Sequence, residues 1–283
     1  DMTFDPVSYK QAVKEEWGSA AIGWHKWIPE INAWSYQATE NMLDQAGVRK
    51  GCRVVDIAAG DGGQSVVAAE RVGKEGEVLA TDIAPEFIEL ANAVAKKLGL
   101  PQLKAEVMDA ESLNLSDNYF DAAISRLGLM YLPDLSKGLS EIKRVLRKGG
   151  KLSAVAFTTS EKTPFFSIPI KLIREKRGLP SPDPGQPGPF SLGTPGVLAE
   201  KLASAGFNDV REQVIDAPLQ FSSAEECVKW RREASGTMNQ MLSGLDDNSK
   251  EKLWNEIVDA MKKFETPQGF VSPCELLICS AVK

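Results

Sequence analysis

Residues 54–63 read VVDIAAGDGG, a short apolar run that ends in an acid and leads into a glycine-rich turn. A helix is predicted to follow, with apolar residues at helical spacing from Val66 to Val72 and Gly73 at its end. A parallel strand buried on both faces has such a continuous apolar run. Glycines past its end let the backbone approach a ligand, and the next helix presents its amide groups there. The stretch therefore predicts the first strand–turn–helix of a nucleotide-type fold. An ordinary tight turn is the alternative.

Two further predicted strands also end in an acid. Residues 77–82 form a short strand that ends in Asp82, which lies 22 positions past Gly60. This spacing matches the acid that binds ribose hydroxyls in nucleotide-binding folds, and a carboxylate can accept two hydrogen bonds from a diol. A helix N-cap is the alternative, since Ala84-Pro85-Glu86 begins a helix. Residues 103–109 form the third strand and end in Asp109.

The rest of the chain continues the alternation of strands and helices before it becomes mainly helical. Further strands are predicted at 120–125, 151–157, 210–215 and 275–282, with a helix from Leu135 that Gly149 and Gly150 end, and helices at 165–177, 198–205 and 222–264. The first fifty residues are predicted to be helical and contain four tryptophans. The proline-rich run at 180–189 predicts a surface loop, and a polyproline docking ligand is the alternative.

Composition and charge exclude several classes of protein. Hydrophobic residues make up 43% of the chain and charged residues 25%, which is typical of a soluble globular enzyme. The net charge of −6 disfavours sequence-independent binding to nucleic acid, which needs a basic face. No apolar run approaches a membrane span. The four cysteines form no CxxC pair and there is one histidine, so no metal site is expected. We expect a cytoplasmic protein, and the sequence leaves its oligomeric state open, a homodimer included.

At this point the chain resembles the class I S-adenosylmethionine-dependent methyltransferases of the ubiquinone/menaquinone-biosynthesis type. The resemblance covers most of the chain and is carried by residues 56–62, 80–85, 107–111, 126–134 and 144–150, and by the helix around Trp17 to Trp34. It implies an α/β fold with a Rossmann-like seven-stranded, mostly parallel sheet in the order 3-2-1-4-5-7-6, the last strand antiparallel, and helices on both faces.

The resemblance also implies a domain organisation. Residues 1–50 would form an N-terminal helical lid segment. Residues 51–283 would form the class I methyltransferase domain, with helical cap insertions at about 161–195 and 220–266. One departure is visible in the glycine-rich turn, where the family usually has acid-x-Gly-x-Gly-x-Gly and this chain has Ala58 in place of the first glycine. Alanine fits this position if its φ is negative.

Carried over by position, the resemblance implies a site for S-adenosylmethionine, with S-adenosylhomocysteine as the product. Asp82 would hold the ribose diol, Asp109 would accept from the adenine amino group, and Asp56 would orient the ammonium group. Gly60 and Gly62 would admit the methionine moiety against the backbone. The other implied cofactor contacts are Ile83, Met108 and Ala110 around the adenine ring, Ser125, Arg126 and Leu127 at the methionine end, and Ala58, Asp61 and Trp27.

A nicotinamide-dependent dehydrogenase is the nearest alternative that shares the turn and the ribose acid. Its fingerprint needs a small third residue at Gly-x-Gly-x-x-Gly, where this chain has Ser65, and it does not explain Asp109. Three strand-end acids suit a diol, an exocyclic amine and an ammonium group, whereas they suit a pyrophosphate poorly. The third acid therefore favours the methyltransferase.

Methyl transfer from a sulfonium is an in-line displacement that mainly requires alignment of donor and acceptor and exclusion of water. A base is needed only if the acceptor must lose a proton. His25 is the candidate base, although a surface histidine is the alternative. Tyr131 and Arg126 are candidates for orienting an acceptor oxygen, and both could instead pack or pair locally.

The expected acceptor is a small aromatic or isoprenoid-like molecule that is methylated on carbon or oxygen. The residues expected to line its pocket are Trp24, Met130, Phe165, Phe166, Trp230 and Met238, for which ordinary core packing is the alternative. The Asn-Pro-Pro-Tyr signature of amino-directed methyltransferases is absent after the fourth strand, so no nucleic-acid partner is expected. An RNA- or protein-directed enzyme, and a methyltransferase-like protein that binds the cofactor without transferring methyl, remain open.

Overall fold

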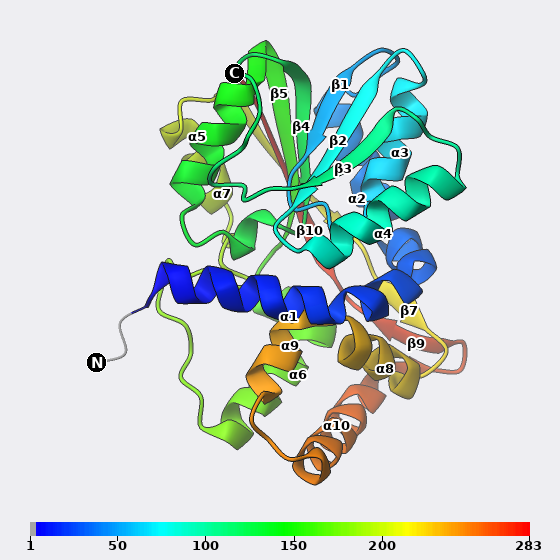
Figure 1. Cartoon of the computed structure of the whole chain (residues 1–283). Helices are drawn as coiled ribbons and strands as arrows, with labels where there is room; N and C mark the ends of the chain where they lie inside the picture. The colour runs from blue at the N-terminus through cyan, green and yellow to red at the C-terminus, as the bar shows by residue number, and fades with distance from the viewer. Residues whose placement is uncertain (1–3) are drawn as a thin grey trace.

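A seven-stranded sheet forms the centre of the computed structural model, which describes residues 4–283 (Figure 1). Its order is β3-β2-β1-β4-β5-β10-β6, and the last strand of the chain, β10, runs antiparallel to both of its neighbours. The predicted order and the antiparallel last strand are therefore confirmed. The strands are β1 (Arg53–Asp56), β2 (Glu77–Asp82), β3 (Leu103–Val107), β4 (Phe120–Arg126), β5 (Leu146–Phe157), β6 (Asn208–Asp216) and β10 (Glu275–Val282).

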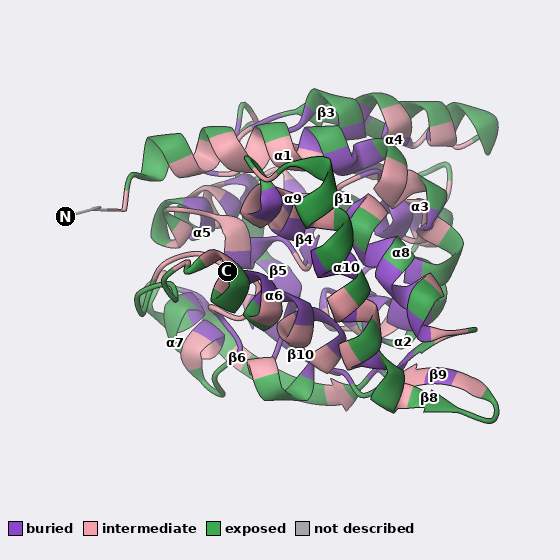
Figure 2. Cartoon of the chain, turned by 90° about the horizontal axis from the view of Figure 1, so that it is seen from below, coloured by how far each residue is buried: buried purple, intermediate pink, exposed green. Residues whose placement is uncertain are grey.

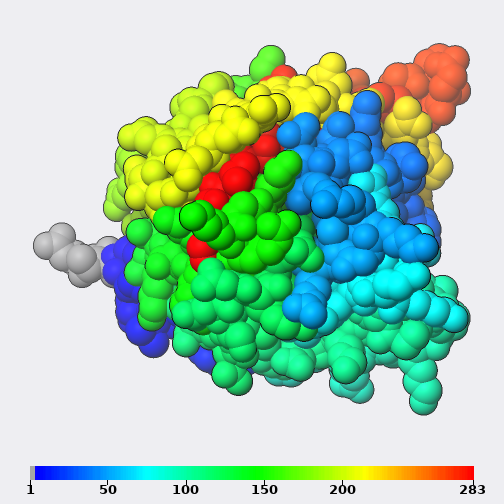
Figure 3. Space-filling view, turned by 90° about the horizontal axis from the view of Figure 1, so that it is seen from above, coloured from blue at the N-terminus to red at the C-terminus, as the bar shows by residue number. Residues whose placement is uncertain are grey.

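Strand β1 occupies the position from which the chain extends in both directions across the sheet. It pairs in parallel with β2 on one side and with β4 on the other, so that Asp56 lies opposite Ala80 and Ile124. Val54, Val55 and Asp56 are all buried, as expected for a parallel strand covered on both faces. Figure 3 shows the side of the sheet that lies farthest from β3. There the red C-terminal strand lies between the green β5 segment and the yellow β6 segment.

Helices cover both faces of the sheet (Figure 1). On one side lie α2 (Ile28–Gln45), α3 (Gly63–Val72) and α4 (Pro85–Lys97), and on the other lie α5 (Leu135–Val145) and α7 (Val197–Ser204). The helix α1 (Pro6–Lys26) crosses the carboxyl edge of the sheet, and Figure 2 shows it from below with mainly exposed and half-buried residues; its buried residues, Gly18, Ala20 and Ala21, lie in its C-terminal half. None of the helices within residues 4–283 has the length and apolar character needed to cross a bilayer.

A second, mainly helical part lies beyond α1. It contains α6 (Pro164–Arg177), α8 (Ala224–Ala234), α9 (Gly236–Leu242) and α10 (Asp247–Met261). The predicted helical stretch at 222–264 is therefore broken into separate helices. Ser235 and Asp246 cause the breaks, because their side chains accept hydrogen bonds from the amides of Met238 at 3.2 Å and Ser249 at 2.7 Å and so begin new helices.

A three-stranded antiparallel sheet in this part was not predicted. It has the order β7-β9-β8 and consists of β7 (Leu219–Phe221), β8 (Glu265–Thr266) and β9 (Gly269–Ser272). Strands of two to four residues are too short to show an alternating pattern in the sequence. The short helical turns are η1 (Leu129–Tyr131), η2 (Ser160–Lys162) and η3 (Lys262–Phe264).

The boundary between α5 and β5 also differs from the prediction. Gly149 and Gly150 were expected to end the helix, but the helix ends at Val145 and the strand begins at Leu146. The two glycines lie inside β5, where Gly149 has a φ of +80° and the pairing with β4 shifts register. Glycine in a strand permits such an irregularity, so the same residues that suggest a helix end here mark a bulge.

The turn after β1 contains a left-handed alanine. The φ of Ala58 is +55°, so the expectation of a negative φ at this position is wrong. A left-handed conformation costs a residue with a Cβ roughly 1–2 kcal/mol. Hydrogen bonds of the tight turn hold Ala58 in this conformation. The amide of Ala59 donates to Thr81 O at 2.9 Å, and the amide of Gly62 donates to Ala59 O at 3.2 Å.

Replacing Ala58 with glycine should stabilise the fold by up to about 1 kcal/mol, because relief of the left-handed strain outweighs the extra freedom of glycine in the unfolded chain. Chemical denaturation measures the change.

Gly128 supplies a sharper test, because a Cβ added there would lie 2.5 Å from the Cβ of Ala58 while its own φ of −121° suits any residue.

Gly128→Ala alone should therefore destabilise the protein strongly, whereas the same substitution should cost much less in the Ala58→Gly background. A double-mutant cycle gives the coupling directly, and we expect at least about 1 kcal/mol. Additive effects of the two substitutions would show that the contact between the two turns does not constrain the fold.

Candidate active site

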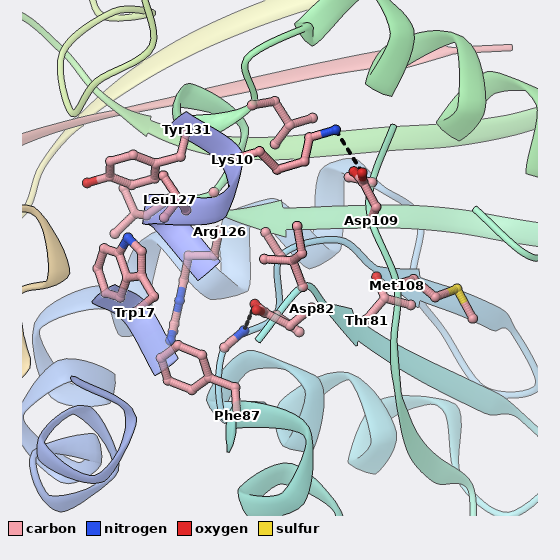
Figure 4. Close-up of a pocket in the computed structure, with 18 of the residues that line it drawn as sticks. Lys10, Trp17, Thr81, Asp82, Phe87, Met108, Asp109, Arg126, Leu127 and Tyr131 are labelled. Carbon is pink, nitrogen blue, oxygen red and sulfur yellow. Dashed lines mark hydrogen bonds and ion pairs between the residues drawn. The ribbon is translucent and has the colours of Figure 1, made fainter. Parts of the chain in front are cut away.

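A cavity lies at the carboxyl ends of β1, β2 and β4, where α1 covers the edge of the sheet (Figure 4). It contains about 1040 Å³ of space free of protein atoms, part of which opens to solvent. We call it the central cavity. The predicted site residues on its wall are Trp24, Ala58, Gly60, Asp82, Ile83, Met108, Asp109, Ala110, Arg126, Leu127 and Tyr131.

Asp82 lies at the end of β2 and points toward the glycine-rich turn (Figure 4). Its carboxylate accepts hydrogen bonds from the amides of Gly60 and Ala84, each at 3.0 Å. The N-cap of α4 is Ala84, with no side-chain cap hydrogen bond, so the alternative that Asp82 caps this helix is wrong, and Asp82 lies on the cavity wall. Burial raises the pKa of Asp82 to about 6, and the amide hydrogen bonds oppose the rise. Each carboxylate oxygen still has a free lone pair for a ligand hydroxyl.

Asp109 follows β3 and lies across the cavity from Asp82 (Figure 4). The Nζ atom of Lys10, on α1, lies 2.8 Å from Asp109 and 3.1 Å from Glu111. Glu111 is buried and also accepts a hydrogen bond from the amide of Asp134 at 3.3 Å. The pairs join the N-terminal half of α1 to the third strand end. Lys10 and Glu111 were not predicted as site residues, because nothing local to either of them indicates a partner about a hundred positions away.

The floor of the site holds two acids around one arginine. Asp56 is fully buried beneath the turn, where its Oδ2 accepts from Ser65 Oγ at 2.5 Å and its Oδ1 has no hydrogen-bond partner. Burial raises the pKa of Asp56 to about 7, and the Ser65 bond and the charge of Arg126 oppose the rise. Burial also raises the pKa of Asp61, opposed by His25 and Arg126. Asp56 and Asp61 are therefore not on the cavity wall.

Arg126 reaches this floor from the end of β4. Its Nη1 donates to Ser35 Oγ and Thr39 Oγ1 on α2, each at 2.9 Å. Burial lowers the pKa of Arg126, and the charges of Asp56 and Asp61 oppose that shift. The guanidinium is thus held by α2 and by the acids of the floor, which leaves it poorly placed to bind an acceptor oxygen without rearrangement.

Aromatic residues form the wall nearest α1. Trp17 lies edge-on to Trp24 and to Tyr131, with ring centroids 5.7 Å apart in each pair, and 6.4 Å from Phe87. Trp17 and Phe87 line the cavity beside the predicted Trp24 and Tyr131 (Figure 4). Of the four tryptophans in the first fifty residues, Trp17 and Trp24 lie on α1 and line this cavity, and Trp17 was not predicted as a site residue. Phe87 was not predicted as a site residue either.

Several predicted residues lie away from the central cavity. Trp27 donates from Nε1 to Glu233 at 2.6 Å, and His25 Nδ1 lies 3.3 Å from Asp61 Oδ2. Ser125 Oγ donates to Ile57 O at 2.8 Å, and Gly62 caps α3 behind the turn. The residues expected to line an acceptor pocket, apart from Trp24, are buried in the core, namely Met130, Phe165, Phe166, Trp230 and Met238. Their alternative, ordinary core packing, is what the structure shows for these side chains.

Backbone strain is concentrated at the central cavity. Among residues 4–283, the non-glycine residues with positive φ are Ala58, Asn118, Leu127 and Asp209. Ala58 and Leu127, with φ of +55° and +60°, both lie on the cavity wall, at the ends of β1 and β4. Strained residues persist where the surrounding structure holds them, and they often mark ligand sites. Leu127 is fixed by its amide, which donates to Val155 O at 2.8 Å.

Comparisons with known proteins agree with this geometry. A family model described as a methyltransferase domain matches residues 48–178. The ubiquinone/menaquinone biosynthesis C-methyltransferase UbiE of Chromobacterium violaceum is 40% identical over 128 residues, which cover 44% of this chain and 52% of that protein. The chain spans about half the length of the curated relatives it matches.

Solved structures share the fold at low sequence identity. The YcgJ protein of Bacillus subtilis has a TM-score of 0.59 and 19% identity, covering 88% of this chain and 98% of that one. The [4+2]-cyclase SpnF has a TM-score of 0.55 and 17% identity, covering 87% and 80%. The matched domain, the similarity to UbiE and the sheet order together support a class I S-adenosylmethionine-dependent methyltransferase, and the solved structures share its fold.

Proposed function

We propose that this protein transfers a methyl group from S-adenosylmethionine to a small acceptor. The observation that carries the proposal is the convergence of Asp82 and Asp109 on one cavity beside Gly60. Carboxylates at two adjacent strand ends offer acceptors for a ribose diol and for an exocyclic amine. The gap between them is bordered by the apolar side chains of Ile83 and Met108, which suits a flat ring.

In this proposal each group of the wall has a defined task. Asp82 holds the ribose hydroxyls, and Asp109 accepts from the adenine amino group, with Ile83, Met108 and Ala110 against the ring. The methionine end lies along Gly60 and Leu127, at the end of the cavity nearest β4. The bound cofactor supplies an electrophilic methyl group on a sulfonium, and the chain aligns that methyl with the acceptor and excludes water. Trp17, Trp24 and Phe87 exclude water on the side of α1.

Tyr131 is the polar group of the wall best placed to orient an acceptor. Burial raises the pKa of its phenol, opposed by a hydrogen bond with Thr237 and by the charge of Arg231. The hydroxyl is therefore protonated near neutral pH, so it can donate a hydrogen bond and is a weak base. His25 lies off the wall and beside Asp61, so its participation as a base would require a movement of α1.

The acceptor proposed here is a small aromatic or isoprenoid-like molecule, methylated on carbon or oxygen. The apolar wall and the similarity to a quinone-biosynthesis C-methyltransferase support this class. One structural neighbour is named a [4+2]-cyclase, and a shared fold does not decide the reaction. A protein that binds the cofactor without transferring methyl is thus the second candidate. Transfer of labelled methyl across a panel of phenols and quinols separates the two, and its complete absence favours the second.

The cofactor assignment is tested by calorimetric titration with S-adenosylhomocysteine. We expect Asp82→Ala to weaken binding by roughly 1.5–3 kcal/mol, because it removes a charge-assisted hydrogen bond to the ligand. No measurable binding to the native protein would refute the assignment. Leu98→Ala, an exposed site on the far end of α4, serves as the control and should bind like the native protein.

The affinity should also depend on pH through Asp82. Its pKa is raised to about 6 in the free protein, so the carboxylate that accepts from the ribose is present above this pH and is lost below it. We therefore expect binding of S-adenosylhomocysteine to weaken as the pH falls from about 7.5 to about 5, by up to about tenfold per unit below the pKa. Asp82→Asn should flatten this dependence, although Asp56 also titrates in this range. If the affinity fell with pH by the same slope in both proteins, Asp82 would not contact the ligand.

Lys10 should control how fast the ligand enters. Its ion pairs with Asp109 and Glu111 lie at the end of the cavity proposed to take the adenine, so the side chain of Lys10 stands where the ligand passes to reach Asp109. Lys10→Met should raise the association rate for S-adenosylhomocysteine several-fold, measured by the fluorescence of Trp17 and Trp24 in stopped flow. Lys14→Met, one turn further along α1, is the matched control. Equal association rates in all three proteins would show that the pairs do not limit entry.

A further inference from the structure

A recess lies at the amino edge of the sheet, opposite the central cavity, on the side of the molecule that Figure 3 shows. It contains about 590 Å³ of space free of protein atoms, part of which opens to solvent. We call it the amino-edge recess. Its wall comes from three segments that are far apart in the sequence. These are residues 46–52 between α2 and β1, Asp121 on β4, and residues 147–151 on β5.

Positive charge dominates the wall of the amino-edge recess. Four cations line it, namely Arg49, Lys50, Arg147 and Lys151, and all four are exposed. Asp121 is the acid among its lining residues. The chain as a whole has 39 acidic and 33 basic residues, so its composition does not account for a cluster in which cations outnumber acids.

The acids near the recess leave two of these cations without a partner. Asp121 accepts hydrogen bonds from Arg147 Nε at 2.5 Å and from the amide of Arg53 at 2.8 Å, so both of its oxygens are engaged. Lys50 Nζ lies 3.5 Å from Glu75. Within residues 4–283, neither Arg49 nor Lys151 forms an ion pair with a carboxylate.

The two unpaired cations lie against the same glycine. A Cβ added to Gly47 would lie 3.9 Å from Cδ of Lys151 and 4.0 Å from Nη1 of Arg49. Gly47 follows α2 with a φ of +69°, and its amide donates to Asp44 O at 3.0 Å, which fixes the turn. Side chains from the segment before β1 and from β5 thus converge at one point of the recess.

The carboxyl end of α2 is the alternative partner for these cations, because a helix C-terminus attracts positive charge. Its last turn is already satisfied, since the carbonyls of Met42, Leu43 and Asp44 accept hydrogen bonds from the amides that follow the helix. The carboxylate of Asp44 pairs with Arg71 at 2.8 Å. Two cations that converge without an acceptor repel each other, and a bound anion would relieve the repulsion.

The donors of the recess suit a phosphate group. A guanidinium offers two parallel N–H groups that match phosphate oxygens, and an ammonium group adds a compact charge. A phosphate monoester carries a charge of about −1.5 to −2 near neutral pH, which balances two cations, whereas a carboxylate carries a single charge. The site is concave, so it suits a free molecule that enters it rather than a flat lipid surface.

We propose that the amino-edge recess is a second ligand site and that it binds a free phosphate-bearing anion through Arg49 and Lys151. Arg147 lines the same recess and adds to its positive field. The occupant lies at the opposite edge of the sheet from the central cavity, so it does not touch the reacting atoms. The proposal goes beyond the proposed function and does not depend on it.

Calorimetric titration with inorganic pyrophosphate at fixed ionic strength tests the proposal. We expect the native protein to show saturable binding with a dissociation constant below about 1 mM, and Arg49→Gln and Lys151→Gln each to weaken it at least about tenfold. Lys97→Gln on α4 is the matched control, because Lys97 is exposed, forms no ion pair within residues 4–283 and loses the same charge. All three variants should keep the native unfolding temperature, since they change exposed side chains.

Two results of this titration would overturn the proposal. One is the absence of saturable binding by the native protein. The other is an equal loss of affinity in all three variants, because that would reflect the net charge of the protein and not a site at Arg49 and Lys151.

The place and the source of the phosphate are tested separately. Saturating S-adenosylhomocysteine should leave the affinity for pyrophosphate unchanged, and competition between the two would place pyrophosphate in the central cavity and overturn the proposal. Vesicles of phosphatidylglycerol present phosphate on a lipid surface, and we expect the protein not to cosediment with them. Cosedimentation that Arg49→Gln abolishes, in a protein that does not bind pyrophosphate, would make the ligand a lipid surface and would overturn the proposal of a free anion.

Discussion

The backbone turn between Asp56 and Gly62 is the constraint on which the site depends. β1 has β2 on one side and β4 on the other, so the chain segments that follow these strands diverge and leave a crevice at the end of β1. The chain after β1 must change direction sharply, because otherwise it would occupy that crevice. It does so with a left-handed Ala58 and with amides that bond to β2 and to Asp82. The space thus left open is the central cavity.

The same turn explains the unusual electrostatics beneath it. Because the turn is tight, Asp56 and Asp61 are enclosed under it rather than directed into the cavity, and burial raises the pKa of each. Arg126 offsets these acids, and it is itself held by hydroxyls on α2. The floor is therefore a nearly balanced cluster of buried charge. The wall above it carries three acids, Asp82, Asp109 and Glu111, of which Asp82 and Asp109 follow their strands directly and suit a diol and an amine.

The sequence predicted the sheet because its signals are local. Apolar runs, strand-end acids and glycine turns recur in order from Val54 to Gly150, and each lies within a few residues of the element it defines. The order of the strands came from the resemblance, and the structure confirms it. The prediction was wrong at positions where the same residue type is compatible with two different local conformations. Gly149 marks a bulge rather than a helix end, and Ala58 has the φ expected of glycine.

The site was predictable only in the part that lies next to these signals. Asp82 and Asp109 follow their strands directly, so a parallel sheet brings them to one edge. The aromatic and methionine residues of the second half could not be divided between core and pocket, because both environments select apolar side chains at helical spacing. Phe165 and Trp230 pack in the core with ring centroids 5.6 Å apart. Lys10 gains its meaning only from partners distant in sequence.

The helix α1 connects these separate observations. Lys10, Val13, Trp17 and Trp24 lie on one helix and contribute to the central cavity, and Val13 and Trp17 also line a cavity between α1, α6 and α9. Close approach holds the helix in place, since a Cβ at Gly236 would lie 2.8 Å from the ring of Trp17. Contacts along α1 therefore fix one wall of the central cavity, with Lys10 paired to Asp109 and Glu111 and Trp17 packed edge-on against Tyr131. Both sets of contacts depend on the position of α1, because they lie on the same helix.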